Sequence, residues 1–205
     1  MDWEERYKDK LVGMEEAVAL IRSGDVVTSN FGGSIPYAFL DALADYAAEH
    51  LENVTLYLAG FYKETRIAAK SLNGHIAVRS CFLGPCERAA IAAGADISYQ
   101  SMHLANINDD RLGKHRARVL VAAGSVPDEN GRISLGVAPF DPILLDVCET
   151  VIIQVNRNMP FVFGEDCTIP VERVSCLIAC DEALPAVCRL FPGACTGRTG
   201  SISPP

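Results

Sequence analysis

The feature that most constrains this chain is a repeated alternation of short apolar runs with segments of helical periodicity. The runs that predict strands are 25–30, 54–58, 76–81, 97–99, 119–123, 132–135, 150–155 and 174–178. The segments that predict helices are 14–23, 35–50, 63–72, 85–93 and 140–148. Strands that are apolar almost throughout are typical of a sheet covered on both faces. We therefore predict an α/β fold with an open, mainly parallel sheet flanked by helices, in which ligands bind beyond the carboxyl ends of the strands.

Composition supports a folded domain and excludes several classes of partner. The 205 residues are 49% hydrophobic, which is enough to bury a sizeable core. Asp and Glu number 26 against 18 Lys and Arg, so the net charge is -8, no basic block occurs, and nucleic acid is not an expected partner. No apolar run approaches the roughly 20 residues that span a bilayer, and the charged start, Met1 to Arg6, lacks the apolar segment of a signal peptide. We expect a cytoplasmic protein with no membrane partner.

Eight cysteines stand at positions 81, 86, 148, 167, 176, 180, 188 and 195. Because the chain is long, apolar and without a secretory signal, we expect reduced, buried thiols rather than disulfides. The spacings from Cys81 to Cys86 and from Cys176 to Cys180 depart from the CxxC spacing of zinc sites, and no pair of histidines completes a ligand set. We predict no metal site and no tightly bound cofactor.

Two loops after predicted strands have the composition of ligand-binding turns. Gly32, Gly33 and Ser34 separate a strand from a helix, where glycine lets the backbone approach a ligand and the helix N-terminus offers unpaired N–H groups; Ser34 can cap that helix. The spacing fits neither GxGxxG nor a Walker loop, so a tight structural turn and a site for a phosphate or thioester oxygen both stay open. Arg88 falls in the first turn of the predicted helix 85–93, an unfavourable place for a cation. Two roles for Arg88 therefore stay open, a clamp for an anionic ligand and a solvated surface arginine.

Three further segments supply candidate site residues. The stretch 125–131 contains Val126 and Pro127, and its Pro and Asn-Gly residues predict a segment folded back on itself, which needs no chemistry to exist. Asn156 ends a buried strand, where its amide either satisfies backbone groups or faces a ligand. His103 has no Ser/His/Asp or Cys/His arrangement around it, so a structural or substrate-edge role is favoured over that of a general base.

Taken in order, these segments resemble the acetyl-CoA hydrolase/transferase family of class I CoA-transferases, and within it the 4-hydroxybutyrate and butyrate:acetate CoA-transferase type. The resemblance covers about 1–185. Its most specific motifs are Ser-Val-Pro-Asp-Glu-Asn-Gly at 125–131, Ser-Leu-Gly at 134–136 and Gln-Val-Asn-Arg-Asn-Met-Pro at 154–160. The other matching positions are Asp2, Trp3, Tyr7, 15–18, 21–27, 53–56 and Gly164.

The resemblance implies one half of a two-domain enzyme, because members of the family have two similar open α/β halves with the active site between them. The family moves CoA from an acyl-CoA to a free carboxylate, through a glutamate that attacks the thioester and then carries CoA as its own thioester. The resemblance places that glutamate in the second half. Six glutamates of this chain do not match the family's nucleophile motif: Glu64, Glu87, Glu129, Glu165, Glu172 and Glu182. We therefore expect 1–187 to be a CoA-transferase N-terminal domain without a catalytic residue of its own.

The substrates that the resemblance implies are acetyl-, butyryl- or 4-hydroxybutyryl-CoA and a carboxylate such as acetate, with coenzyme A as substrate rather than as a bound cofactor. The residues expected to line the acyl or CoA cleft, as backbone donors, an anion clamp and apolar contacts, are Gly32, Gly33, Ser34, Arg88, His103, Val126, Pro127 and Asn156. The expected protein partner is a second domain or subunit, or another copy of the chain.

The last residues form a tail of a different character. Residues 188–205 contain no Asp or Glu and show no periodicity, which fits either a flexible terminus or a tail read in an altered frame after about Val187. Two other functions stay open: an inactive fragment with an exposed domain interface, and a non-catalytic module that binds CoA or a sugar phosphate.

Overall fold

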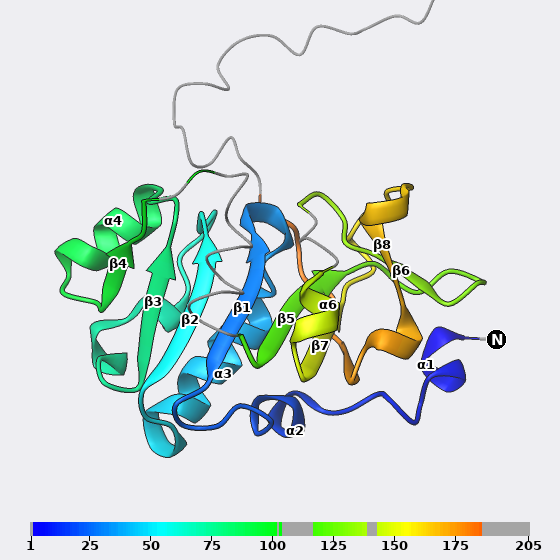
Figure 1. Cartoon of the computed structure of the whole chain (residues 1–205), viewed down its shortest axis with the longest axis horizontal. Coiled ribbons are helices and arrows are strands. Elements are labelled where there is room, and N and C mark those ends of the chain that lie inside the picture. The colour runs from blue at the N-terminus through cyan, green and yellow to red at the C-terminus, as the bar shows by residue number, and fades with distance from the viewer. Residues whose placement is uncertain (1, 102, 104–116, 139–142, 186–205) are drawn as a thin grey trace, which may run out of the picture.

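Seven parallel strands form the main sheet of the computed structural model, which describes residues 2–101, 103, 117–138 and 143–185 (Figure 1). Their order is β4-β3-β2-β1-β5-β7-β9. The strands are β1 (Val26–Phe31), β2 (Val54–Ala59), β3 (Ile76–Ser80), β4 (Ile97–Tyr99), β5 (Val119–Gly124), β7 (Thr150–Val155) and β9 (Cys176–Ala179). Two more strands, β6 (Arg132–Ser134) and β8 (Thr168–Pro170), pair antiparallel in a small second sheet. The predicted α/β fold with an open, mainly parallel sheet is confirmed.

Helices and 3₁₀ turns connect these strands. The α-helices are α1 (Trp3–Arg6), α2 (Met14–Val18), α3 (Tyr37–His50), α4 (Pro85–Ala92) and α6 (Leu144–Val147). The 3₁₀ turns are η1 (Gly32–Ser34), η2 (Arg66–Ala68), η3 (Lys70–Leu72), η5 (Glu165–Cys167) and η6 (Val171–Arg173). The helix predicted over 14–23 ends early, at Val18, and the Arg22 N–H donates to Asp25 Oδ2 at 2.7 Å. Part of the helix predicted over 140–148, and the tail predicted at 188–205, lie outside the described residues.

The prediction of an α-helix over 63–72 was wrong, because this segment forms the two short turns η2 and η3. The Asp41 carboxylate accepts the Thr65 hydroxyl at 2.6 Å and the Arg66 N–H at 2.8 Å, which fixes the start of η2 from another element. Ala69 then adopts an extended conformation, with φ -87° and ψ 142°, and separates the two turns. Helical spacing of apolar residues was present, but contacts with α3 set the backbone.

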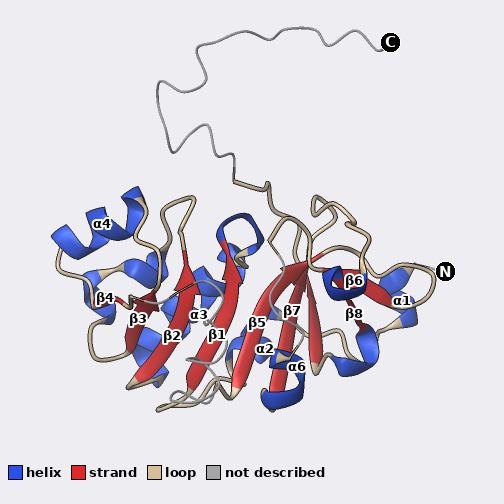
Figure 2. Ribbon diagram, turned by 45° about the horizontal axis from the view of Figure 1, so that its top comes forward, coloured by secondary structure: helices blue, strands red, loops and turns tan. Residues whose placement is uncertain are grey.

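The core has two parts, one on each face of the main sheet. Successive residues of a strand point to opposite faces; accordingly, in β5, Val119 and Val121 join the first cluster, whereas Leu120 and Ala122 join the second. The first cluster packs under α2 and α3, and the second under α1, α6, β6 and β8, so that the central strands are covered on both sides (Figure 2). This coverage explains why the strands are apolar almost throughout.

The order in which the chain adds strands to the sheet reverses at β1. From β1 the chain moves outward through β2 and β3 to β4, and then returns to place β5 on the other side of β1, with Val27 paired to both Leu56 and Val119. The loops that leave the carboxyl ends of β1 and β5 therefore diverge. Such a switch point is where open α/β sheets bind their ligands.

The first residues of the chain are held by its last described strand. Leu11 forms a parallel bridge to Leu177 of β9, with the Val12 N–H donating to the Leu177 carbonyl at 2.9 Å and the Leu177 N–H donating to the Lys10 carbonyl at 2.8 Å. The segment before α2 thus runs along the edge of the sheet at β9.

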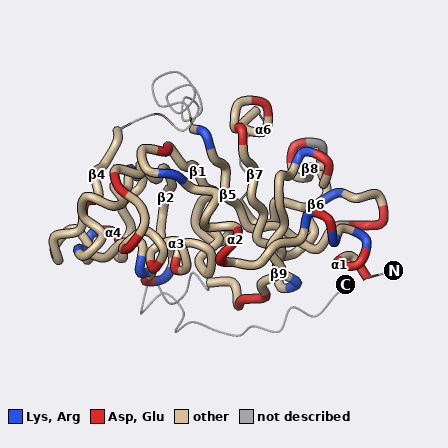
Figure 3. The backbone as a smooth tube through the Cα atoms, turned by 90° about the horizontal axis from the view of Figure 1, so that it is seen from below, with Lys and Arg blue, Asp and Glu red and all other residues tan. Residues whose placement is uncertain are grey.

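Acidic and basic residues are mixed along the described backbone (Figure 3). Figure 3 shows Lys and Arg positions scattered among Asp and Glu positions rather than gathered on one element. Within the described ranges, none of the helices combines the length and the apolar character needed to cross a membrane.

Candidate functional site

The carboxyl ends of the parallel strands bring most of the predicted site residues to one edge of the main sheet, which we name the carboxyl edge. Those within three residues of the end of a central strand are Gly32, Gly33, Ser34, Val126, Pro127 and Asn156. Arg88 and His103 follow the outer strands β3 and β4. The topology therefore places six of these residues together and two further out.

The two glycines of η1 lie close against neighbouring side chains. Gly32 is buried with φ +46°, and a Cβ there would lie 2.6 Å from the Tyr62 ring. A Cβ on Gly33 would lie 2.8 Å from Val137 Cγ2. A Cβ at either position would displace its neighbour, and Gly32 is the more restricted of the two because its φ also disfavours any side chain, so the glycines let Tyr62 and Val137 cover the turn.

The prediction that Ser34 caps the following helix was wrong. Its buried hydroxyl donates to the Leu135 carbonyl at 3.1 Å and accepts from the Ala138 N–H at 3.0 Å. Both partners follow β6, so Ser34 joins the turn after β1 to the segment beyond β5. Pro36 is the N-cap residue of α3, and its side chain makes no capping hydrogen bond.

Two side chains from distant segments instead accept the free N–H groups at the N-terminus of α3, one from β7 and one from the segment after β9. The Phe39 N–H donates to Gln154 Oε1 at 3.0 Å, and the Ala38 N–H donates to Glu182 Oε1 at 3.3 Å. Gln154 Nε2 donates to the same Glu182 oxygen at 2.7 Å, and Lys63 Nζ lies 2.9 Å from Glu182 Oε2. A carboxylate of the chain itself thus occupies the position where a helix N-terminus attracts an anion.

Asn156 uses its amide on backbone groups near the same place. Its Nδ2 donates to the Glu182 carbonyl at 2.8 Å, and its Oδ1 accepts from the Asn158 N–H at 2.9 Å. The side chain is 1% exposed. Asn156 therefore ties the end of β7 to the segment after β9, the first of the two roles that its position left open.

The other predicted residues lie at the periphery or within the core. Arg88 is exposed on α4 and donates through Nη1 to the Leu83 carbonyl at 2.6 Å. His103 is exposed beyond β4. Val126 is half-buried against the second core cluster, and Pro127 is buried.

Sequence patterns did not point to the buried polar side chains that organise this edge. Glu87 is fully buried, and its Oε1 accepts from the Phe61 N–H at 2.5 Å. Burial raises the pKa of Glu87, and the backbone N–H of Phe61, which stabilises the carboxylate, offsets part of that rise. The available signal was a glutamate at the third position of a helix that begins with Pro85, where a carboxylate can reach back to free N–H groups.

Tyr37 links two of the loops. Its buried hydroxyl accepts from the Tyr62 N–H at 2.7 Å and donates to the Gly32 carbonyl at 3.1 Å. Burial raises the pKa of Tyr37, so the hydroxyl stays protonated and can donate at any ordinary pH. Lys63 Nζ lies 4.7 Å from the centre of the Tyr37 ring, so the same ring also contacts the cation that pairs with Glu182.

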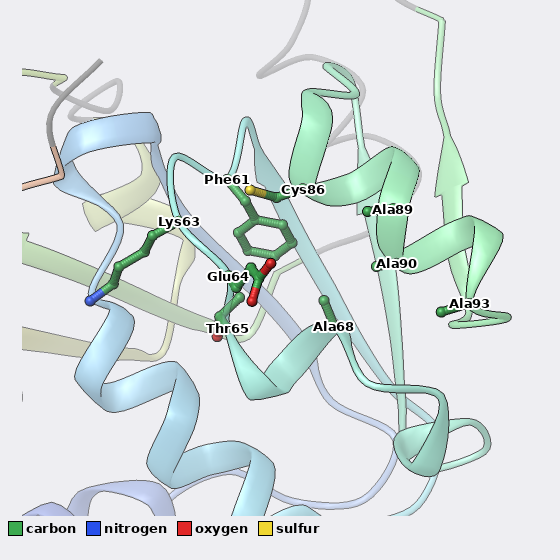
Figure 4. A pocket seen from close by; sticks show the side chains of 9 residues that line it. All are labelled: Phe61, Lys63, Glu64, Thr65, Ala68, Cys86, Ala89, Ala90 and Ala93. Atoms are coloured by element: carbon green, nitrogen blue, oxygen red, sulfur yellow. The ribbon is translucent and has the colours of Figure 1, made fainter. Parts of the chain in front are cut away.

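A cavity of about 250 Å³ lies beside this edge, between η2 and α4 (Figure 4). Its wall is largely methyl groups and one aromatic ring, while the Lys63 side chain extends away toward α3 (Figure 4). The lining residues are Phe61, Lys63, Glu64, Thr65, Ala68, Cys86, Ala89, Ala90 and Ala93. Phe61 and Lys63 connect this cavity to the turn after β2.

The cysteines at positions 86, 148, 167, 176 and 180 are free thiols. Burial raises the pKa of Cys148 and of Cys176 to about 11, so these thiols stay protonated and unreactive. In the part of the chain that the structure covers, His, Cys, Asp and Glu side chains nowhere gather in threes that could hold a metal ion.

Comparison with known families identifies the type of domain. The family model for the acetyl-CoA hydrolase/transferase N-terminal domain matches residues 1–189. The chain belongs to this family. The resemblance noted in the sequence is therefore confirmed, and the carboxyl edge described above is that of an acetyl-CoA hydrolase/transferase N-terminal domain.

Two curated relatives of this family member are CoA transferases. The chain is 30% identical to a 4-hydroxybutyrate coenzyme A transferase of Clostridium kluyveri, over 173 residues that cover 80% of the chain and 38% of the relative. It is also 30% identical to a succinyl-CoA:cyclohexane-1-carboxylate CoA transferase of Geobacter metallireducens, with coverage of 89% and 41%. The chain thus spans about two fifths of the length of these relatives.

Solved structures support the same fold. RipA from Yersinia pestis superimposes with a TM-score of 0.78 at 26% identity, covering 90% of the chain and 45% of RipA. A 4-hydroxybutyrate CoA-transferase from Porphyromonas gingivalis gives a TM-score of 0.63 at 21% identity, over 89% of the chain and 42% of that protein. The second match supports the fold alone.

Proposed function

We propose that this chain forms the N-terminal wall of a CoA-transferase, which moves CoA between an acyl-CoA, such as acetyl-, butyryl- or 4-hydroxybutyryl-CoA, and a free carboxylate such as acetate. The observation that carries the proposal is the family match over 1–189. Both curated relatives are named as CoA transferases, one for 4-hydroxybutyrate and one for cyclohexane-1-carboxylate. Coenzyme A is proposed as a substrate, with no tightly bound cofactor.

The state of two site glutamates supports a nucleophile supplied by another part of the enzyme. A carboxylate that attacks a thioester must reach the carbonyl carbon and be free of strong partners. Glu87 is fully buried and holds the Phe61 N–H. Glu182 is shared by the α3 N-terminus, Gln154 and Lys63. Both carboxylates therefore act on the protein rather than on a substrate, and we propose that the catalytic glutamate lies in a second domain or subunit.

Apolar side chains on the carboxyl edge support such a partner. Phe82 and Tyr99, after β3 and at the end of β4, are 60% and 56% exposed, and Val137, beside the glycine turn, is 55% exposed. Phe163, in the loop after β7, is 85% exposed. Exposed apolar groups at one edge of a sheet are typical of an interaction surface. A second domain, a separate subunit or another copy of the chain would cover them.

Free thiols also bear on where the protein works. Reduced cysteines persist in compartments kept reducing by glutathione and thioredoxin. The cysteines at positions 86, 148, 167, 176 and 180 form no disulfide, which supports the proposed cytoplasmic location, where acyl-CoA and free acetate would both be at hand.

The test combines binding with turnover. The purified chain is incubated with butyryl-CoA and acetate, and acetyl-CoA is measured by mass spectrometry, while a thermal-shift series covers CoA, butyryl-CoA and sugar phosphates. We expect stabilisation by butyryl-CoA, which binds the folded state, without steady production of acetyl-CoA. Steady turnover by this chain would refute the proposed division of labour. Stabilisation by sugar phosphates alone would favour a non-catalytic module, and no shift with any compound would indicate an inactive fragment.

A further inference from the structure

The turn that follows β2 is held by side chains rather than by a neighbouring strand. Gly60 has φ +71°, which turns the chain away from the sheet. The next two backbone N–H groups then point inward: that of Phe61 donates to Glu87 Oε1 at 2.5 Å, and that of Tyr62 donates to the Tyr37 hydroxyl at 2.7 Å. Two buried side chains from different helices thus fix two successive peptide units.

The two anchors come from rigid elements on opposite sides of the turn. Glu87 lies in the first turn of α4, and Tyr37 is the first residue of α3. Glu87 is 0% exposed and Tyr37 is 1% exposed, so neither competes with water for its partner. The Tyr37 hydroxyl also donates to the Gly32 carbonyl at 3.1 Å, which fastens the β2 turn to the glycine turn η1.

The position of this turn determines what covers the switch point of the sheet. The ring of Tyr62 lies so close over Gly32 that a Cβ there would be 2.6 Å from the ring. The next residue, Lys63, reaches Glu182 at 2.9 Å. A shift of the turn by 1 Å would move an aromatic ring and a cation at the place where the proposed substrates would enter.

We propose that Glu87 and Tyr37 are positioning residues, which hold the turn of residues 61–63 over the glycine turn and so set the shape of the site at the carboxyl edge. Neither touches a substrate in this proposal; both act through the backbone of Phe61 and Tyr62. The inference rests on the proposed function for its ligand, but the position of the turn can be measured without any ligand.

The position of the turn is read by nuclear magnetic resonance. The Gly32 Hα signals experience the ring current of Tyr62, so they report where that ring lies. Tyr37→Phe removes a single oxygen atom, and Glu87→Leu removes the acceptor of the Phe61 N–H, whereas Glu87→Gln keeps an acceptor of the same shape. We expect Tyr37→Phe and Glu87→Leu to shift the Gly32 signals toward ordinary glycine values and to speed exchange of the Phe61 and Tyr62 amide protons by at least tenfold.

The conservative variant and the pH profile separate positioning from simple structural support. Glu87→Gln is expected to keep the Gly32 signals. In the unsubstituted chain the Phe61 amide signal should titrate with Glu87, whose pKa burial raises above its ordinary value of 4.5, and in Glu87→Gln this titration should vanish. Matched controls are Tyr46→Phe, near the C-terminal end of α3, and Glu52→Gln, on an exposed loop; both should leave every signal of the turn unchanged.

Binding of butyryl-CoA, measured by calorimetry well below the unfolding transition, gives the consequence for the site. We expect Tyr37→Phe and Glu87→Leu to raise the dissociation constant about tenfold and Glu87→Gln to change it less than twofold. Unchanged Gly32 signals in Tyr37→Phe would overturn the positioning role, even where Glu87→Leu fails to fold. Moved signals with unchanged affinity would overturn the link to the site. If the unsubstituted chain binds no butyryl-CoA, the proposed function fails, and the Gly32 signals still decide the positioning role.

Discussion

Replacing Glu182 by glutamine tests whether this carboxylate holds the N-terminus of α3. Glutamine keeps the shape of the side chain and one oxygen that can accept from the Ala38 N–H. It removes the negative charge that lies beside the helix N-terminus, next to Gln154, and opposite Lys63. The variant therefore isolates the contribution of charge from that of packing.

The magnitude follows from the three contacts of the carboxylate. A charge at a helix N-terminus contributes about 0.3–1 kcal/mol, and a hydrogen bond to a charged acceptor contributes about 1 kcal/mol more than one to a neutral acceptor. The ion pair with Lys63, whose side chain is 41% exposed, is screened by solvent and contributes on the order of 0.5 kcal/mol. We expect Glu182→Gln to lower the free energy of unfolding by about 2 kcal/mol and the Tm by about 4–8 °C.

The assay is urea unfolding followed by circular dichroism, as a double-mutant cycle with Lys63→Met. The cycle should give a coupling energy near 0.5 kcal/mol, which salt reduces. Glu129→Gln, in an exposed turn, is the matched control and should change stability by less than about 0.5 kcal/mol. If Glu182→Gln lowers the free energy of unfolding by no more than the control does, Glu182 is not the group that stabilises the N-terminus of α3.

Two further predictions concern the amino end of the sheet and the glycine turn. Burial alone would raise the pKa of Asp25, but hydrogen bonds from Arg118 outweigh it and lower the pKa, so Asp25→Asn should cost about 3 kcal/mol of unfolding free energy at neutral pH. The stability that a carboxylate with a lowered pKa contributes is lost as the pH falls through that pKa, so the stability difference between the variant and the unsubstituted chain should close below about pH 3.8. A constant stability difference in unfolding scans from pH 7 to pH 3 would contradict this prediction. Gly32→Ala should cost about 3 kcal/mol in urea unfolding, since its φ of +46° strains an alanine and the new Cβ would lie 2.6 Å from the Tyr62 ring. Gly33→Ala meets only the exposed, rotatable Val137 side chain and should cost less than about 1 kcal/mol, and equal losses would show that the ring does not pack as described.

The main sheet was predictable because its signal is local. A strand buried on both faces must be apolar at successive positions, and this pattern is written in the sequence of β5 and β7 themselves. The order of the strands is less local, but short connections and right-handed crossovers leave few arrangements open. The strand predicted over 132–135 is present as β6, and only the strand boundaries and the short strand β8 near residue 168 needed the structure, since β8 has three residues and takes its conformation from pairing with β6.

The candidate site was predictable in place but not in detail. Glycine after a strand indicated the turn at the switch point, yet Ser34 bonds to residues that lie about a hundred positions away rather than capping its own helix. Three separate segments of the chain supply the cluster of Lys63, Gln154 and Glu182, so no spacing of residues in the sequence predicts it. Turn η2 shows the same limit, because Asp41 of α3 decides its conformation. Contacts between distant segments override local preference at these positions.

The bridge between Leu11 and Leu177 sets an order of events during synthesis. Chains emerge from the ribosome with the N-terminus first, and a segment can pair only with residues that have already been made. β1 to β4 can assemble as soon as residue 99 is available, but the first twelve residues must wait for β9, which comes more than 160 positions later. The N-terminal arm, with the apolar side chain of Trp3, therefore remains unprotected for longest in the nascent chain. A partner that binds this arm before β9 appears, such as a chaperone, would act on the last part of the domain to fold although it is the first to be made.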